Sequence, residues 1–162
     1  MNTEENDIDA EDDRRDPRLS LIFGHYGEEH QRWKLVEECG ELLAELGRFK
    51  CGDRTNVADM IHECADVLVV ARQFWTVERH AFEELTIDDA VENLTFWTAE
   101  LAQAMSEETY RLFGPRRLAK IEHYAFALAE LLEEELMIHR AIDMKIERQL
   151  ERIAREAQES GK

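Results

Sequence analysis

Four acidic side chains stand in two pairs with helical spacing, Glu38-x-x-Glu41 and Glu63-x-x-Asp66. Residues three apart on a helix lie on neighbouring turns of one face, so each pair can hold one cation between its carboxylates. Two such helices side by side would offer four carboxylates to a shared site. Magnesium and manganese are hard cations that prefer oxygen ligands. The pattern therefore predicts a site for Mg2+, with Mn2+ as a substitute, in which all four residues are metal ligands.

The second pair carries more weight than the first, because Glu-x-x-Glu alone is common on solvated helices. Asp66 is followed by the apolar run Val67-Leu68-Val69-Val70. An ionised carboxylate in such surroundings costs several kcal/mol unless a cation or hydrogen-bond donors compensate it. A metal is one such compensation, and a basic side chain such as Arg72 or Lys34 is the other.

Long helices must position these pairs, and the apolar residues recur at the three- and four-residue steps typical of amphipathic helices. The chain has only 7 Gly and 2 Pro, which favours helices over strands and turns. The predicted helices cover Glu28 to Phe49, Val57 to Arg79, Leu85 to Phe113 with Thr86 or Asp88 as cap, and Arg116 to Ser160. Gly114-Pro115 is predicted to break the chain before the last stretch, which is either one very long helix or two with a kink near Met137–Arg140. The predicted fold class is all-α, an antiparallel bundle of four or five helices.

The composition of the chain indicates its domain organisation and argues against several classes of partner. Residues 1–17 are almost entirely charged or small, which predicts a disordered acidic tail closed by Pro17, and residues 18–162 form one predicted domain. The N-terminus lacks the pattern of a signal peptide, no apolar run suits a membrane helix, and the three cysteines have no zinc-ligand spacing. These features predict a cytoplasmic protein. The formal net charge of -17 argues against nucleic acid and anionic membranes as partners.

A family resemblance supports the predicted metal site. The segment from Tyr26 to Leu42 resembles the opening helix of MazG-like pyrophosphohydrolases, and the segment from His62 to Val69 resembles their second motif. The family's pattern is Glu-x-x-Glu, a gap, and Glu-x-x-Asp, and here the gap from Leu42 to His62 is 21 residues. The resemblance implies an all-α fold and Mg2+-dependent hydrolysis of a nucleoside triphosphate, with a deoxynucleotide expected first, to the monophosphate and pyrophosphate.

The reaction that the resemblance implies assigns further roles in the site. Glu38 or Glu41 would activate the attacking water in addition to binding metal, and the sequence does not separate ligand from base. Trp33 and Phe49 are candidates for stacking on the base of the nucleotide. An ordinary place in the hydrophobic core is the alternative for both aromatic residues.

A basic stripe near the C-terminus is the candidate phosphate-binding element. The segment from Ala141 to Ile153 resembles the family's last helix, in which basic residues help to hold the triphosphate, so Lys145 and Arg148 are the expected phosphate ligands. Arg152 and Arg155 continue the stripe at helical spacing. The alternative is an exposed helix face stabilised by internal Glu–Arg pairs.

Two other functions fit parts of the pattern. A phosphoribosyl-ATP-type pyrophosphohydrolase uses similar paired carboxylates, although the acidic tail and the long C-terminal half favour it less. A non-catalytic acidic helical binding protein would suit the net charge, but it requires acidic residues spread over a surface rather than set within apolar helices. A ferritin-like di-iron bundle expects Glu-x-x-His pairs, and the sequence has none.

Self-association is a further expectation. A set of leucines in the C-terminal half offers more apolar surface than one short bundle buries: Leu128, Leu131, Leu132 and Leu136. A homodimer is expected first and a homotetramer second, with a nucleotide as the small-molecule partner.

Overall fold

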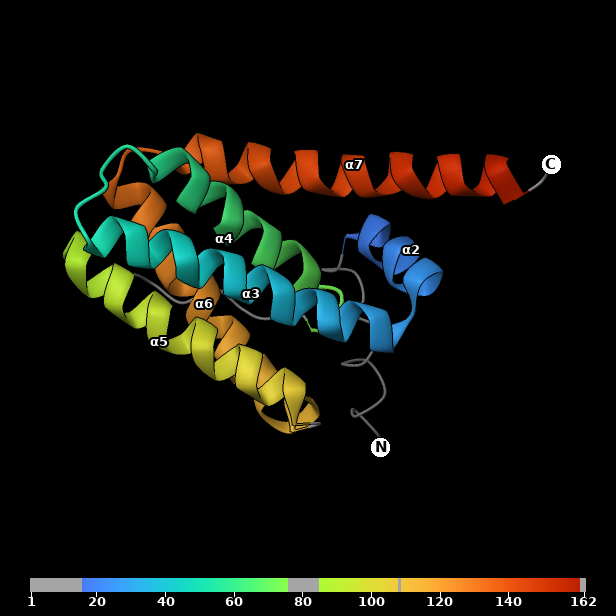
Figure 1. Cartoon of the computed structure of the whole chain (residues 1–162), viewed down its shortest axis with the longest axis horizontal. Coiled ribbons are helices and arrows are strands. Elements are labelled where there is room, and N and C mark those ends of the chain that lie inside the picture. Colours follow the sequence, from blue (N-terminus) through green and yellow to red (C-terminus); the bar gives the residue numbers. More distant parts are fainter. Residues whose placement is uncertain (1–15, 76–84, 108, 161–162) are drawn as a thin grey trace, which may run out of the picture.

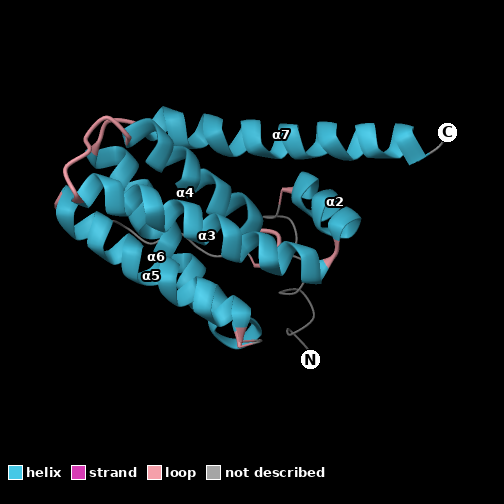
Figure 2. Cartoon of the chain, in the orientation of Figure 1, coloured by secondary structure: helices cyan, strands magenta, loops and turns pink. Residues whose placement is uncertain are grey.

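A computed structural model of the protein describes residues 16–75, 85–107 and 109–160. The chain forms six helices and no strand within these residues, so the predicted all-α class is confirmed (Figure 2). The helices are α2 (Pro17–Tyr26), α3 (Glu28–Lys50), α4 (Val57–Ala71), α5 (Ile87–Ser106), α6 (Tyr110–Leu131) and α7 (Glu135–Ser160). None of the helices described is both long enough and apolar enough to cross a membrane.

Helices α3 and α4 form an antiparallel hairpin that carries the acidic pairs (Figure 1). Helix α5 packs against α3, and α6 packs against α5 and α4. Helix α7 runs along α4 in the same direction and continues past its end, where α2 packs against it. The hairpin therefore has the α5–α6 pair on one side and α7 on the other.

Helix α2 is an element that the sequence patterns did not predict. Asp16 and Pro17, which were assigned to the tail, instead cap and begin this helix. The Asp16 carboxylate accepts a hydrogen bond from the Arg18 backbone N–H at 2.9 Å, and proline suits the first turn because that position needs no N–H. Leu19 and Ile22 are buried and anchor α2 to the bundle. The rest of the predicted tail, residues 1–15, lies outside the described part of the chain.

Both helices of the hairpin begin at the predicted residues, but α4 is shorter than predicted. It ends at Ala71 rather than Arg79, because the chain turns and the Phe74 N–H bonds to the Ala71 carbonyl three residues back. Residues 76–79 of the predicted helix lie outside the described residues. The apolar run that follows Asp66 is buried, since every residue from Val67 to Ala71 is 0 % exposed.

The break predicted at Gly114-Pro115 is wrong. Helix α5 starts at the predicted cap, Thr86, but ends at Ser106, and α6 begins at Tyr110. Gly114 and Pro115 consequently lie inside α6. Pro115 is the sixth residue of α6, where its missing N–H removes one intrahelical hydrogen bond.

The last stretch is two helices, which was one of the two predicted alternatives. The chain turns between Leu131 and Glu135, ahead of the kink expected at Met137–Arg140. Glu133 adopts a left-handed backbone conformation in this turn, with φ of 59°. The turn directs α7 back along the α3–α4 hairpin.

Gly114 lies so close to Trp75 that a larger residue at this position should lower the stability of the protein. We expect Gly114→Ala to destabilise the protein, because an added Cβ would lie 2.1 Å from the Trp75 ring and the indole would have to move. Overpacking of this kind costs about 1–3 kcal/mol, which urea unfolding measures. Gly47→Ala is the control: it lies in the interior of α3 with nothing within 4 Å of an added Cβ. An alanine at position 47 should stabilise the protein slightly, so equal responses of the two variants would contradict the packing argument.

Candidate metal centre

Three carboxylates converge between α3 and α4. Glu38 and Glu41 lie one turn apart on α3, and Glu63 faces them from α4. One oxygen of each lies within 4.8 Å of the others. Glu38 is buried, Glu63 is half-buried and Glu41 is exposed, so the group opens to solvent on the Glu41 side. The structure thus brings together three of the four predicted metal ligands.

Glu38 is the buried centre of the group. Its side chain is 0 % exposed, and Oε1 accepts from the ammonium groups of Lys34 and Lys145, each at 3.0 Å. Its other oxygen, Oε2, is buried and has no hydrogen-bond partner. Because an unpaired carboxylate oxygen is costly in the interior, this atom is suited to bind a cation.

Asp66, the fourth predicted ligand, lies beside the three-carboxylate group and is joined to it by a lysine. The Lys145 Nζ donates to Asp66 Oδ2 at 2.5 Å and to Glu38 Oε1 at 3.0 Å. One side chain of α7 therefore bridges a carboxylate of α3 and a carboxylate of α4. The expected need of Asp66 for a positive partner is met here by Lys145.

The basic residues that were considered as partners of Asp66 have other partners. Arg72 donates from Nε to Glu122 at 2.5 Å, in an ion pair between α4 and α6. Lys34 contacts Glu38 instead, four residues along the same helix. Sequence reasoning therefore missed the role of Lys34, although the i,i+4 spacing of a lysine and a glutamate is a usable signal for a helical ion pair.

Crowding of negative charge shifts the pKa values of the group. Burial, followed by the negative charges around it, raises the pKa of Glu63 to about 7. Burial and the adjacent Glu38 raise the pKa of Glu41, and burial raises the pKa of Asp66 although Lys145 opposes the shift. Burial also acts to raise the pKa of Glu38, but the two lysine ammonium groups outweigh it and hold that pKa below its ordinary value. The site consequently has a deficit of positive charge.

The raised pKa of Glu63 predicts how stability depends on pH. A folded-state pKa of about 7, above the ordinary 4.5, means that protonation of Glu63 favours the fold and that this contribution is lost as pH rises through about 7. The melting temperature in EDTA should therefore fall from about pH 6 to pH 8, and saturating Mg2+ should reduce the fall because a cation stabilises the ionised group.

Glu63→Gln isolates this effect from the titration of histidines. Scanning fluorimetry on the wild type and on this variant, with EDTA or Mg2+, gives the difference attributable to Glu63. Parallel curves for the two proteins in EDTA would contradict the prediction.

The donor set fits Mg2+ or Mn2+. The converging side chains offer only carboxylate oxygens, and Glu38 Oε2 and Glu63 Oε2 are both buried without a hydrogen-bond partner. Magnesium and manganese prefer such oxygen donors, whereas a softer metal would favour sulfur or nitrogen. Glu38, Glu41 and Glu63 would hold the cation, and Asp66, whose Oδ2 contacts Lys145 in this structure, would be the fourth ligand once the lysine releases it.

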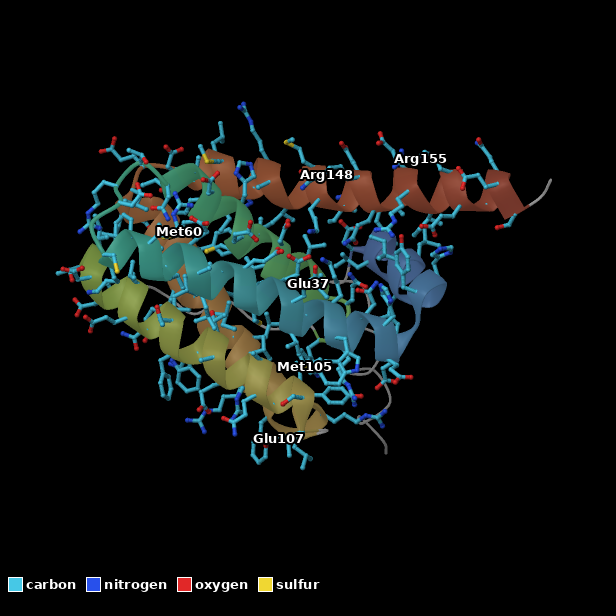
Figure 3. All side chains as sticks on the ribbon, viewed as in Figure 1. Glu37, Met60, Met105, Glu107, Arg148 and Arg155 are labelled. Carbon is cyan, nitrogen blue, oxygen red and sulfur yellow. The ribbon has the colours of Figure 1, made fainter. Side chains whose placement is uncertain are left out.

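The predicted basic stripe lies along α7, and its members are in different environments. Lys145 reaches the carboxylates, whereas Arg148 and Arg155 are exposed along the helix (Figure 3). Arg152 donates to Glu156 at 3.0 Å, which is the internal pairing that the alternative interpretation expected for this stripe. Lys145 contacts Glu38 and Asp66 directly, and the positive charge of Arg148 acts to lower the pKa of Asp66.

An open cleft of 660 Å³, called the α3 cleft below, lies along the first half of α3. Its lining residues are Tyr26, Gly27, Glu28, Glu29, His30, Trp33, Lys34 and Glu37. Trp33 is 50 % exposed in this cleft, and Lys34 connects the cleft to Glu38. Phe49, the other predicted stacking residue, is buried at the far end of α3 under the Arg54 guanidinium, 3.9 Å from the ring centre. The structure therefore places Trp33 in a cleft that it shares with Lys34, the partner of Glu38, and Phe49 away from that cleft.

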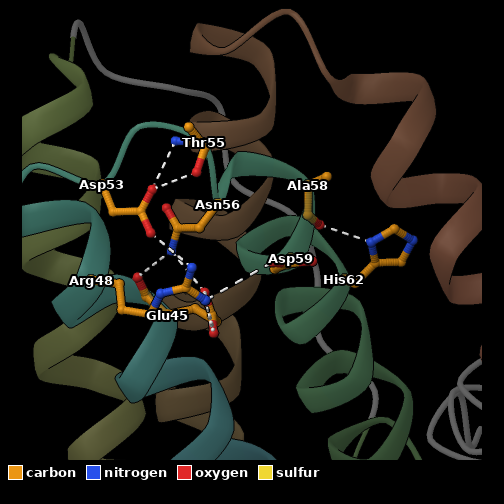
Figure 4. A network of polar contacts seen from close by, with 8 residues as sticks. All are labelled: Glu45, Arg48, Asp53, Thr55, Asn56, Ala58, Asp59 and His62. Atoms are coloured by element: carbon orange, nitrogen blue, oxygen red, sulfur yellow. Dashed lines mark hydrogen bonds and ion pairs between the residues drawn. The ribbon is translucent and has the colours of Figure 1, made fainter.

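A polar network holds the loop between α3 and α4 (Figure 4). Asn56 Nδ2 donates to the backbone carbonyl of Glu45 at 2.9 Å and to its carboxylate at 2.7 Å. Arg48 pairs with Glu45 at 2.8 Å and with Asp53 at 2.7 Å, and Asp53 accepts from the Thr55 hydroxyl at 2.6 Å. Because this loop is the turn of the hairpin, the network helps to set the register at which the carboxylates of α4 meet those of α3.

Comparison of the chain with models of protein families, with curated proteins and with solved structures finds no match.

Proposed function

We propose that this protein hydrolyses a nucleoside triphosphate to the monophosphate and pyrophosphate with Mg2+ as its cofactor. The observation that carries the proposal is the convergence of Glu38, Glu41 and Glu63 within 4.8 Å, with two buried carboxylate oxygens that have no hydrogen-bond partner. The resemblance of both motifs to MazG-like pyrophosphohydrolases supports the reaction type. Asp66 and Lys145 supply the fourth carboxylate and a cationic group next to it.

The proposed roles follow from burial and charge. Glu41 activates the water, because it lies on the open side of the site, where a water molecule can reach its carboxylate. Glu38 serves as a fixed ligand, since it is buried and stays paired with Lys34, one turn away on the same helix. Bound Mg2+ would neutralise charge on the phosphates and favour attack at phosphorus. Lys145 and Arg148 hold the phosphates from the α7 side.

The α3 cleft is the proposed position of the nucleoside. Trp33 presents a half-exposed indole next to Lys34, which itself contacts the buried Glu38. Tyr26 and His30 stack on each other at the same cleft, with ring centroids 5.1 Å apart. Aromatic faces of this kind suit a nucleobase, while the carboxylate group one turn further along α3 suits the phosphates.

A substrate panel tests the proposed activity. Purified protein is incubated with each common ribo- and deoxyribonucleoside triphosphate and Mg2+, and the products are separated by ion-exchange chromatography. We expect equimolar monophosphate and pyrophosphate from at least one substrate, with a deoxynucleotide tried first, and no reaction in EDTA. Release of orthophosphate, or no turnover of any nucleotide, would overturn the proposal.

The two alternative functions can be tested on the same purified protein. Phosphoribosyl-ATP belongs in the panel, because the paired carboxylates also suit that substrate. A non-catalytic binding protein predicts a melting temperature that is indifferent to Mg2+ and nucleotide, whereas the proposed enzyme is stabilised by both.

A homodimer remains part of the proposal, with a homotetramer as the second possibility. Among the leucines that suggested it, Leu128 is buried inside the bundle, while Leu131 is 39 % exposed and Leu136 is 66 % exposed. These two side chains lie near the turn that joins α6 to α7. Light scattering on the purified protein decides the oligomeric state, and a monomer would refute self-association.

A further inference from the structure

Lys145 occupies a position between two carboxylates that belong to different helices. Its Nζ lies 3.0 Å from Glu38 Oε1 and 2.5 Å from Asp66 Oδ2, and its side chain is only 13 % exposed. Glu38 Oε2, the neighbouring oxygen of the same carboxylate, is buried without a partner. The ammonium group therefore neutralises part, but not all, of the negative charge of this buried pair.

We propose that Lys145 exchanges between two partners. Its ammonium group is the counter-ion of Glu38 and Asp66 before a divalent cation binds, and it turns to the phosphates of the nucleotide once Mg2+ takes those carboxylates. The inference rests on the proposed function and extends it, because it makes metal binding and phosphate binding two consequences of one lysine movement.

Electrostatics makes the two cations compete. An ammonium group in hydrogen-bond contact with Asp66 repels a divalent cation that approaches the same oxygen, and this repulsion is strong where water is largely excluded. Lysine is a compact charge on a flexible four-carbon stem, so it can leave the carboxylates without any movement of α7. The triphosphate then provides a negative partner for the released ammonium group, on the side of the site that α7 covers.

Lys34 is a matched control for this competition. It carries the same charge and contacts the same Glu38 oxygen at the same distance, 3.0 Å. It comes from α3 itself, however, and its second partner is the exposed Glu37 at 3.1 Å rather than Asp66. Loss of either lysine removes one positive charge next to Glu38, but only the loss of Lys145 also releases Asp66.

Metal binding without nucleotide tests the proposal. Isothermal titration with Mn2+ is performed on the wild type, Lys145→Met and Lys34→Met. We expect Lys145→Met to bind Mn2+ about tenfold more tightly than the wild type and Lys34→Met to differ from it by less than about threefold. With Mn2+ and a non-hydrolysable triphosphate analogue, Lys145→Met should bind the analogue about tenfold more weakly than the wild type. Manganese binding by Lys145→Met that is no tighter than that by Lys34→Met would overturn the exchange.

A second measurement uses the wild-type protein, so that its result does not depend on whether a variant folds. Reductive methylation followed by peptide mass spectrometry reports how accessible each lysine amine is. Methylation of Lys145 should accelerate when Mg2+ is added and slow again when the analogue follows, while Lys34 changes less. Constant reactivity of Lys145 would overturn the exchange even if Mn2+ binds, whereas no Mn2+ binding by the wild type would overturn the metal centre itself.

Discussion

Glu38→Gln is expected to lower the rate of pyrophosphate release by a factor of about 10² to 10³, because it removes a charge on which the metal and two lysines depend. Glutamine keeps the volume and one oxygen of the side chain, so the packing of α3 changes little. The buried carboxylate is 0 % exposed and contacts both ammonium groups at 3.0 Å, and a neutral amide cannot replace it as a metal ligand. Steady-state kinetics at saturating Mg2+ measures the loss.

Two further variants make this result specific. Asp66→Asn should cause a loss of similar size, because it removes the charge of the carboxylate that Lys145 bridges to Glu38. Glu130→Gln makes the same chemical change on the exposed surface of α6 and should leave the rate unchanged. Circular dichroism confirms that each protein is folded. Wild-type rates in both Glu38→Gln and Asp66→Asn would contradict the proposal that the four carboxylates form the catalytic metal site.

Arg72→Met should destabilise the fold by about 3–5 kcal/mol, since it leaves a buried carboxylate without its cation. The partner, Glu122, has a side chain only 5 % exposed, and the Arg72 Nε lies 2.5 Å from its Oε1. This ion pair joins the end of α4 to α6, and it lies outside the proposed metal centre. Urea unfolding monitored by tryptophan fluorescence gives the change in the free energy of unfolding.

A double variant separates the buried charge from lost packing. Arg72→Met combined with Glu122→Met replaces both charges by apolar groups, and it should be more stable than Arg72→Met alone. Lys50→Met breaks an exposed pair with Glu92 and should change stability little. If Arg72→Met proved no more harmful than Lys50→Met, the Glu122 carboxylate would not need its partner.

The helical hairpin and its acidic pairs could be predicted from the sequence because their signals are local. A stripe of apolar residues at helical spacing marks α3, and both α3 and α4 start at the predicted residues, Glu28 and Val57. The spacing of Glu38, Glu41 and Glu63 predicted one shared group, and their oxygens lie within 4.8 Å of one another. Within each helix, face and spacing follow from the 3.6-residue period, which the sequence contains directly.

Features that depend on contacts between distant segments could not be predicted from local sequence patterns. Helix α2 is stabilised by burial of Leu19 and Ile22, and Gly114-Pro115 continues a helix where local rules predicted a break. Local propensities are weak enough for such packing to override them.

The partners of the carboxylates likewise depend in part on the local sequence and in part on tertiary packing. That Asp66 needs a positive partner follows from its apolar neighbours in the sequence. That the partner is Lys145, 79 positions away, rather than Arg72 or Lys34, depends on how α7 packs along α4. An ion pair between helices is set by the three-dimensional course of both, because side chains of a few ångströms' reach meet only where tertiary packing has already brought their backbones together.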